Sequence, residues 1–208
     1  MKLIVTKNSL RRVLRWAQRG LFAVAIALLG YCGFVLTDAW IFQLRANSAL
    51  ERRLQDERSR NGTSTQATVA TLDSPPAIAP DGLIGRIEIR RIGLSAIVFE
   101  GVDKNTLRHA VGHIPDTALP GKPGNAGLAA HRDTFFRPLK DVRLGDAITL
   151  TTLRGEYRYR VVSTRVVPPT EVSVLDPSEN QVLTLVTCYP FYFVGAAPER
   201  FIVRAERD

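Results

Sequence analysis

The chain has 208 residues, enough for one domain with appended segments, and carries a formal net charge of +8. Up to Arg60, eleven Lys and Arg residues stand against four Asp and Glu, whereas from Leu83 onward the numbers are seventeen and fourteen. The positive excess is therefore N-terminal. Together with the lack of a recognised nucleic-acid-binding motif, this argues against nucleic acid as a partner.

The chain begins with a basic segment followed by an apolar run. Six cations between Lys2 and Arg19 precede residues 21–36, which nothing polar interrupts. The run extends to 42 if Asp38 lies in the far interface, and it then reaches the roughly 17–25 residues that span a bilayer. This order predicts a cytoplasmic basic tail over 1–20 and a transmembrane anchor over 21–42, so that the remaining chain lies outside the cell.

Two other interpretations of this segment stay open. A cleaved signal peptide has the same order of charged and apolar residues, but Thr37-Asp38-Ala39 is a poor cleavage site and the basic region is long. A buried helix of a soluble protein is disfavoured by the unbroken apolar run. Under either membrane interpretation the bulk of the chain is exported.

Residues 43–82 predict a helical stalk and then a flexible linker. The stalk, 43–60, has apolar residues near helical spacing (Leu44, Ala46, Leu50 and Leu54) and charges of mixed sign. A solvated charged linker is the alternative. Residues 61–82 are rich in Thr, Ala, Pro and Gly without periodicity, which is typical of a flexible spacer.

From Leu83 the pattern changes to short strands separated by Gly and Pro. Apolar and polar residues alternate over 85–92, 156–162 and 200–206, while 147–153 and 181–187 are rich in β-branched residues. Only 103–110 indicates a short helix, with Asp103 as its N-cap. The domain 83–208 is therefore predicted to be all-β, a sandwich or a closed barrel.

Two of the three histidines, His109 and His113, have the i,i+4 spacing of a helical metal site. Gly112 between them and Pro115 after them argue against a helix through both. No acidic or thiol ligand is adjacent, so turn-stabilising or surface roles are favoured and no metal site is predicted.

The residues that indicate chemistry stand at strand ends. Cys188 ends the run 181–187, and Pro190 stops the strand just after it; Cys32, the other cysteine, lies in the apolar run. A single exported thiol with a histidine elsewhere is a candidate nucleophile and base pair. His131 ends another apolar run, and Arg200 opens the last strand. A guanidinium can stabilise both a thiolate and an oxyanion. A buried structural thiol is the alternative for Cys188.

At these residues the sequence resembles the sortase family, the cysteine transpeptidases of bacterial surfaces. "TLVTC" (184–188) is similar to the motif that ends in the family's nucleophile, "ERFIVRAE" (199–206) to the strand that begins with its catalytic arginine, and 112–136 to the stretch that leads to its catalytic histidine. The similarity covers about 83–206 and is greatest to the class D type. One departure is Ala130, where many relatives have Gly.

The resemblance implies an eight-stranded sortase-type β-barrel with short helices, and a two-step acyl transfer by Cys188, His131 and Arg200. The partners it implies are secreted surface proteins that carry a C-terminal sorting signal like Leu-Pro-x-Thr-Gly or Leu-Pro-x-Thr-Ala, an acceptor amine on a cell-envelope precursor or another protein, and the membrane. No cofactor is implied. Thr187 is a further candidate for substrate binding, together with Arg200.

Two other functions stay open, of which only the first uses the same residues. A membrane-anchored thiol hydrolase has water as the acceptor, and no motif in the chain separates it from a transpeptidase. A non-catalytic barrel that binds surface peptides is the third hypothesis, and the complete set of Cys188, His131 and Arg200 argues against it.

Overall fold

The computed structural model describes residues 7–63, 77–192 and 195–208. They form two compact units, one up to Ile41 and one from Phe42 to Asp208. The predicted linker lies mostly in 64–76, outside the described residues, as does the start of the basic tail. Each unit is described by itself.

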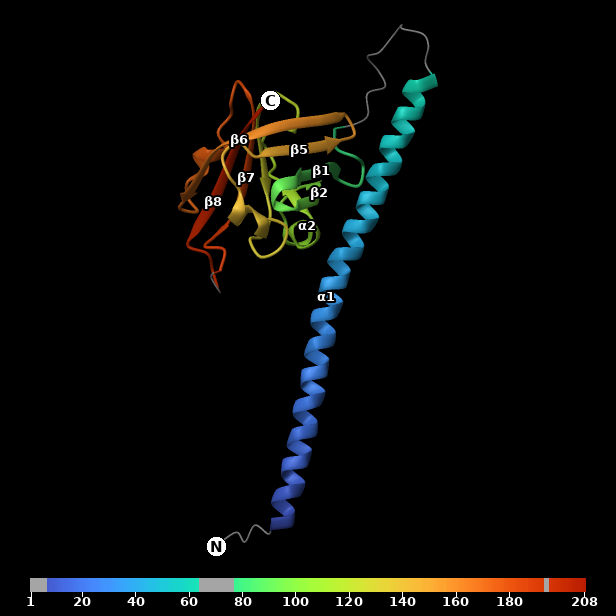
Figure 1. Ribbon diagram of the computed structural model, residues 1–208, viewed down its shortest axis with the longest axis vertical. Helices are drawn as coiled ribbons and strands as arrows, with labels where there is room; N and C mark the ends of the chain where they lie inside the picture. The colour runs from blue at the N-terminus through green and yellow to red at the C-terminus, as the bar shows by residue number, and fades with distance from the viewer. Residues whose placement is uncertain (1–6, 64–76, 193–194) are drawn as a thin grey trace. The chain divides into compact units, whose positions relative to one another are not determined.

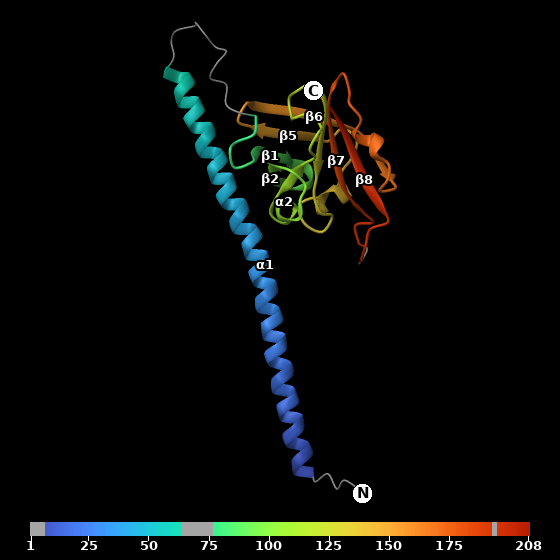
Figure 2. The same cartoon turned by 180° about the vertical axis from the view of Figure 1, so that it is seen from behind.

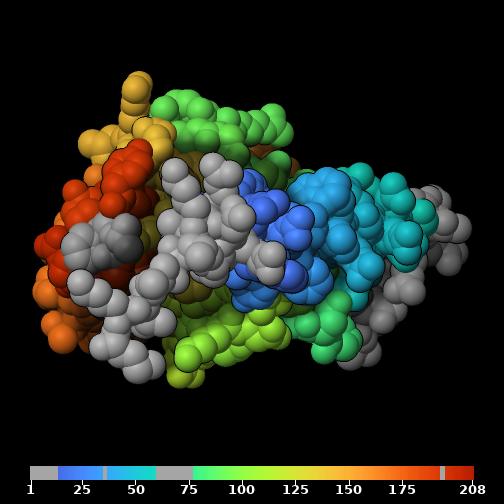
Figure 3. All heavy atoms as spheres, turned by 90° about the horizontal axis from the view of Figure 1, so that it is seen from below, coloured from blue at the N-terminus to red at the C-terminus, as the bar shows by residue number. Residues whose placement is uncertain are grey.

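The second unit is built on a closed barrel of eight strands, in the order β1-β2-β3-β4-β7-β8-β6-β5 (Figures 1 and 2). The strands are β1 (Leu83–Ile89), β2 (Leu94–Glu100), β3 (Val111–His113), β4 (Gly124–Ala129), β5 (Ala147–Thr152), β6 (Gly155–Val167), β7 (Gln181–Tyr189) and β8 (Glu199–Arg207). Helix α2 (Lys104–His109) and three short 3-10 helices lie in the connections: η1 (Arg90–Ile92), η2 (Arg137–Asp141) and η3 (Val172–Leu175). In the space-filling view the orange and red atoms of the C-terminal strands gather on one side of the surface (Figure 3).

The all-β barrel confirms the predicted fold class. The five predicted strands correspond to β1, β5, β6, β7 and β8, and Asp103 caps α2 by accepting hydrogen bonds from the backbone N–H groups of Asn105 and Thr106. The pattern missed β2 and β3, and β3 has only three residues and therefore shows no periodicity. The strand β4, GNAGLA, is indicated only by the apolar run that ends at His131, because its residues are mostly small and buried and show no alternation.

The barrel interior is filled by side chains that alternate along the strands. On β1, for example, Ile87 and Ile89 are fully buried whereas Arg86 and Glu88, which alternate with them, are partly exposed. The same alternation places Leu183 and Leu185 of β7 and Val203 and Ala205 of β8 in the core. Their neighbours in sequence therefore point to the outer face, which carries the candidate site.

The segment of helix α1 (Lys7–Thr63) from Phe42 onward belongs to the same compact unit as the barrel. Leu50 is fully buried in a second apolar cluster, which also contains Ala79, Leu83, Ile97 and Leu153, with Ala46 and Leu54 packed at its edge. The predicted stalk residues are thus helical, and their apolar face packs on the outside of β1 and β2. The sequence pattern alone did not predict this contact.

Polar contacts surround that apolar cluster. The amide of Gln43 accepts a hydrogen bond from the N–H of Ile97 at 3.0 Å and donates one to the carbonyl of His109 at 2.6 Å. The Arg86 guanidinium donates to Asn47 and Glu51 at 2.7 and 2.9 Å. The helix therefore occupies a defined register on the barrel.

The first unit contains the apolar part of α1. Residues 14–59 are long and apolar enough to include a membrane span, with a mean hydropathy of 2.1 over the most apolar window, and that window is wholly exposed. The helix could therefore span a bilayer, as the sequence predicts.

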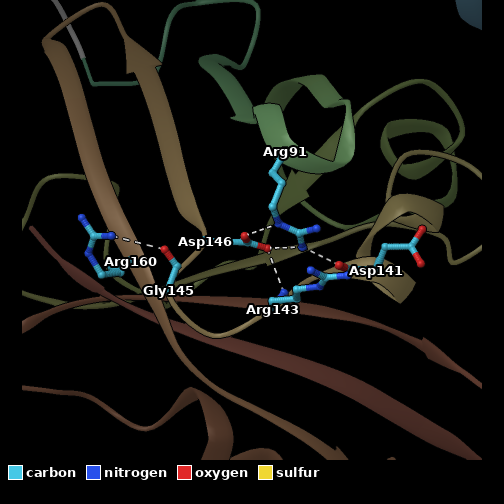
Figure 4. A network of polar contacts seen from close by, with 6 residues as sticks. All are labelled: Arg91, Asp141, Arg143, Gly145, Asp146 and Arg160. Atoms are coloured by element: carbon cyan, nitrogen blue, oxygen red, sulfur yellow. Dashed lines mark hydrogen bonds and ion pairs between the residues drawn. The ribbon is translucent and has the colours of Figure 1, made fainter.

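An ion-pair network holds the connection between β4 and β5 (Figure 4). The Arg91 guanidinium, on η1, pairs with the buried carboxylate of Asp146 (Nη2 to Oδ2, 2.6 Å) and also donates to the carbonyl of Asp141 at the end of η2. Asp146 accepts the N–H of Arg143 at 2.8 Å as well. Hydrogen bonding to Arg91 is the largest cause that holds the pKa of Asp146 below its usual range. The network holds the C-terminal end of the connection between β4 and β5, and His131 lies at the N-terminal end of that connection.

Candidate active site

Cys188 lies near the end of β7 and is half-buried. Because Leu183 and Leu185 point into the core, strand alternation directs Thr184, Val186 and Cys188 to the outer face. The thiol therefore sits at the barrel surface and not in the core, which argues against the alternative of a structural thiol.

His131 is brought beside Cys188 by the parallel pairing of β4 and β7. The register pairs Gly124 with Gln181 and continues to Ala129 with Val186. Beyond the last pair, the N–H of Ala130 still donates to the carbonyl of Val186 at 3.3 Å. The strand β4 itself ends at Ala129, but the same register continued by two residues predicts that His131 is level with Cys188, at the strand spacing of about 4.8 Å.

Arg200 is brought to the other side of Cys188 by β8. The two residues are direct partners in the antiparallel pairing of β7 with β8. Directly opposite residues have Cβ atoms about 4.5–5.5 Å apart on the same face. The Arg200 guanidinium donates through Nη1 to the carbonyls of Glu199 at 3.0 Å and Ala197 at 3.4 Å, which hold it beside the β7–β8 connection.

Thr187 is placed differently. Its side chain is buried, with 2% of the residue exposed, and its hydroxyl donates to the carbonyl of Ala130 at 2.8 Å. Ala130 directly precedes His131, so this bond ties the residue before the thiol to the residue before the imidazole. The geometry favours a positioning role, and the substrate-binding role of Thr187 stays a prediction.

The backbone on each side of these residues is anchored by aromatic side chains. Tyr189 stacks on Phe201, and Phe191 meets both rings edge-on, with centroids 5.3–6.2 Å apart. After His131, the carbonyl of that residue accepts the N–H of Phe136 at 3.2 Å, and Phe136 is fully buried. The segment after Cys188 is therefore held by contacts between aromatic rings, and the segment after His131 by a buried phenylalanine.

The sequence does not predict the contact that Arg132 makes. Its Nη2 donates to the carbonyl of Gly195 at 3.0 Å, so it links the segment after His131 to the β7–β8 connection. The adjacency of Arg132 to His131 is visible in the sequence, but Gly195 lies 63 residues away and nothing in the sequence pairs the two.

The remaining histidines take structural positions. The ring of His109 lies 5.1 Å from that of Phe42, and its Nδ1 is 3.0 Å from the carbonyl of Asn105 within α2. His113 is buried at the end of β3. Among the described residues the structure contains no group of three His, Cys, Asp or Glu side chains that could hold a metal ion.

The strand pairings therefore place the Cys188 thiol of β7 opposite Arg200 of β8, and the imidazole of His131 follows two residues after the end of the neighbouring strand β4. A family model for the sortase domain matches residues 87–208. The chain belongs to the sortase family. It is 30% identical to Sortase D of Bacillus subtilis (strain 168) over 191 residues, which cover 90% of this chain and 95% of that relative.

Solved sortase structures share the barrel. The chain of Listeria monocytogenes sortase A superposes with a TM-score of 0.57 at 30% identity, covering 62% of this sortase and 88% of that chain. A Clostridium perfringens sortase D5 transpeptidase has a TM-score of 0.62 at 24% identity, covering 80% and 98%, and shows the fold. This sortase is therefore an enzyme of the transpeptidase family, and the non-catalytic hypothesis loses its support.

Proposed function

We propose that this sortase cleaves a C-terminal sorting signal similar to Leu-Pro-x-Thr-Gly or Leu-Pro-x-Thr-Ala after its Thr, and transfers the Thr carbonyl to an amine at the cell surface. The observation that carries the proposal is the strand order β4-β7-β8, in which Cys188 pairs directly with Arg200, while the strand β4 on the other side of β7 leads to His131 two residues after its end. Similarity to Sortase D over nearly the whole chain supports it.

The chemistry divides into two steps. In the first, the Cys188 sulfur attacks the Thr carbonyl carbon, the amide C–N bond breaks, and His131 gives a proton to the leaving amine; the product is a thioester. In the second, the acceptor amine attacks the thioester, His131 takes its proton, and the Cys188 thiolate leaves. Cationic neighbours favour the thiolate form that the first step needs.

Arg200 stabilises the negative oxygen that forms in both steps. Its guanidinium has five N–H donors in a planar fork, and the two bonds to Glu199 and Ala197 involve only Nη1. Loss of one oxyanion donor typically costs about 2.7–4 kcal/mol, so Arg200→Ala lowers kcat by roughly 100- to 1000-fold. Arg200→Lys is the matched variant, because it keeps the charge and loses the fork.

The helix α1 serves as the anchor, with the N-terminus in the cytoplasm and the barrel outside. This orientation rests on the six cations before the apolar run. Substrates are secreted proteins held in the same membrane, which raises their effective concentration at the site. The acceptor amine belongs to a cell-envelope precursor or to another protein.

Mass spectrometry tests the nucleophile. The full chain in detergent micelles is incubated with a sorting-signal peptide without an amine, and we expect an acyl adduct on Cys188. Cys188→Ala should abolish the adduct, and Cys32→Ala, which removes the other thiol, should leave it. Absence of both adduct and cleavage with every signal peptide contradicts the proposal.

The acceptor separates the transpeptidase from the hydrolase. With increasing amine concentration, a transpeptidase yields an increasing ratio of amide product to hydrolysed peptide. A ratio that stays near zero at saturating amine supports the thiol hydrolase instead, with the same three residues and water as the acceptor.

The orientation is tested by labelling. In intact cells that carry the Cys32→Ala chain, a membrane-impermeant maleimide should label Cys188, because the barrel lies outside. Labelling only after the cells are lysed contradicts the proposed orientation, but it does not contradict the proposed two-step acyl transfer.

A further inference from the structure

The position of the Arg200 guanidinium depends on the β7–β8 connection that precedes it. The backbone of Arg200 is fixed by its pairing with Cys188. A long side chain is not fixed by its backbone alone, because each of its torsions has several staggered wells. Nη1 of Arg200 donates to the carbonyl of Glu199 at 3.0 Å and to that of Ala197 at 3.4 Å. Glu199 belongs to β8, whereas Ala197 lies in the connection, so the guanidinium is held in part by the connection.

Burial contributes little to the position of this end of the connection. Gly195, Ala196 and Pro198 are exposed, and Ala197 is half-buried. None of these residues has a large apolar side chain that could pack in the core, and a segment with few buried apolar contacts opens easily. Polar contacts with neighbouring segments therefore have a large effect on where the Ala197 carbonyl lies.

Arg132 makes such a contact. Its Nη2 donates to the carbonyl of Gly195 at 3.0 Å, two residues before Ala197. Hydrogen bonds from a charged donor are stronger than those between neutral groups. Two guanidinium groups thus bind carbonyls of one short stretch: Arg132 binds Gly195, and Arg200 binds Ala197.

The backbone of Arg132 belongs to a turn that is anchored in the core. The N–H groups of Thr134 and Phe136 both donate to the carbonyl of His131, at 3.4 and 3.2 Å. Phe136 is fully buried, and so is Leu139 in the η2 helix that follows. Arg132 therefore reaches the β7–β8 connection from a segment that burial fixes.

A second contact joins the same two segments. Lys140 of η2 interacts with Tyr192 of the β7–β8 connection, and this interaction adds to the hydrogen bond with Asp141, the largest cause, in raising the pKa of Lys140. Tyr192 is 75% exposed, so this contact is a surface one. It lies near the start of the connection, whereas Arg132 holds the end that leads to Arg200.

We propose that Arg132 is a positioning residue that holds the end of the β7–β8 connection through the Gly195 carbonyl, and thereby sets the position of the Arg200 guanidinium beside Cys188. In this role Arg132 acts through Arg200 and needs no contact with the substrate. The effect on turnover rests on the proposed function. The contact between the two segments does not.

Steady-state kinetics of the full chain in micelles test the role. Arg132→Met keeps most of the apolar stem and removes every donor. We expect kcat for the sorting-signal peptide to fall about tenfold, with KM changed less than about twofold, because the oxyanion that Arg200 stabilises exists only along the reaction path. Arg137→Met, which removes an exposed guanidinium from the same β4–β5 connection, is the matched control and should leave both constants unchanged. A higher KM with an unchanged kcat contradicts the proposal.

A double-mutant cycle with Arg200→Lys separates this role from a direct one. Lysine keeps the charge and loses the planar fork that the Ala197 carbonyl orients. If Arg132 acts through Arg200, Arg132→Met should lower kcat less than about twofold in the Arg200→Lys chain. An equal loss of about tenfold in both chains means that the two residues act independently, and it overturns the proposal.

Hydrogen exchange followed by mass spectrometry measures the contact without any substrate. The first two residues of β8, Glu199 and Arg200, are paired with β7. Arg132→Met should make exchange at this end of β8 about fivefold faster, because the strand end opens more easily once the connection is released, and Arg137→Met should not change it. Unchanged exchange in the Arg132→Met chain overturns the proposal, whatever the enzyme acts on.

Two further outcomes are distinguishable. A lower unfolding midpoint for Arg132→Met with an unchanged kcat overturns the positioning role, because the contact is then structural only. If the wild-type chain cleaves no sorting signal, the proposed function fails, and hydrogen exchange still decides whether Arg132 holds the connection.

Discussion

Truncation of Leu50 to Ala tests whether the helix after the apolar run is part of the folded catalytic unit. Leu50 is fully buried against Ala79, Leu83, Ile97 and Leu153. Buried Leu→Ala changes cost about 2–5 kcal/mol, depending on how far the site can collapse. This cluster lies between a helix and the outside of the barrel, where the helix can move inward. We therefore expect a loss in the lower half of that range, about 2–3 kcal/mol.

Urea and thermal unfolding of the full chain in micelles, followed by near-UV circular dichroism of the barrel tyrosines, measure this loss. For a domain of this size it corresponds to a midpoint lowered by roughly 4–12 °C. Leu44→Ala is the matched control, since Leu44 is on the same helix but 47% exposed, and it should change the stability by less than about 0.5 kcal/mol. Equal effects of the two substitutions would refute the packing argument and return this segment to a solvated stalk.

Three further substitutions probe the barrel. Asp146→Asn removes the charged partner of Arg91. The pKa of Asp146 is depressed in the folded state, so the ionised carboxylate stabilises the fold above the usual carboxyl pKa. This stabilisation is lost as the pH falls through the pKa of Asp146 in the folded state. Urea midpoints should thus differ between wild type and variant near neutral pH and converge below about pH 4. Gly85→Ala places a Cβ 2.1 Å from the Thr151 carbonyl oxygen, so we expect a loss of about 3 kcal/mol in the same urea assay; a loss below about 1 kcal/mol contradicts the close approach. Asp103→Ala removes the cap of α2 and should cost about 1 kcal/mol, whereas Asp103→Asn should restore most of it.

Much of the candidate site follows from local signals in the sequence. Cys188, His131 and Arg200 each stand where an apolar strand pattern meets turn residues, and a strand end at the surface is where a reactive side chain is accessible. Once Leu183 and Leu185 of β7 are known to be buried, alternation directs Cys188 away from the core. These signals are local because side-chain direction in a strand depends only on position parity.

The contacts of buried polar side chains could not be predicted in this way. Nothing in the sequence indicates the hydrogen-bond partners of His113 and Thr187, although both residues are candidates for other roles. The partner of His113 is Glu100, thirteen residues earlier, and that of Thr187 is Ala130, fifty-seven residues earlier. Hydrogen bonds of this kind depend on strand register, which is a property of the closed barrel.

The sequence by itself determined the apolar helix, the all-β domain, the three candidate catalytic residues and the family, because periodicity, charge order and contiguous motifs are carried by neighbouring residues. Only the tertiary structure decided that β7 lies between β4 and β8 and that Leu50 belongs to the folded unit. The physical reason is that strand order and burial arise from contacts between segments far apart in the chain, whose pairing no local pattern encodes.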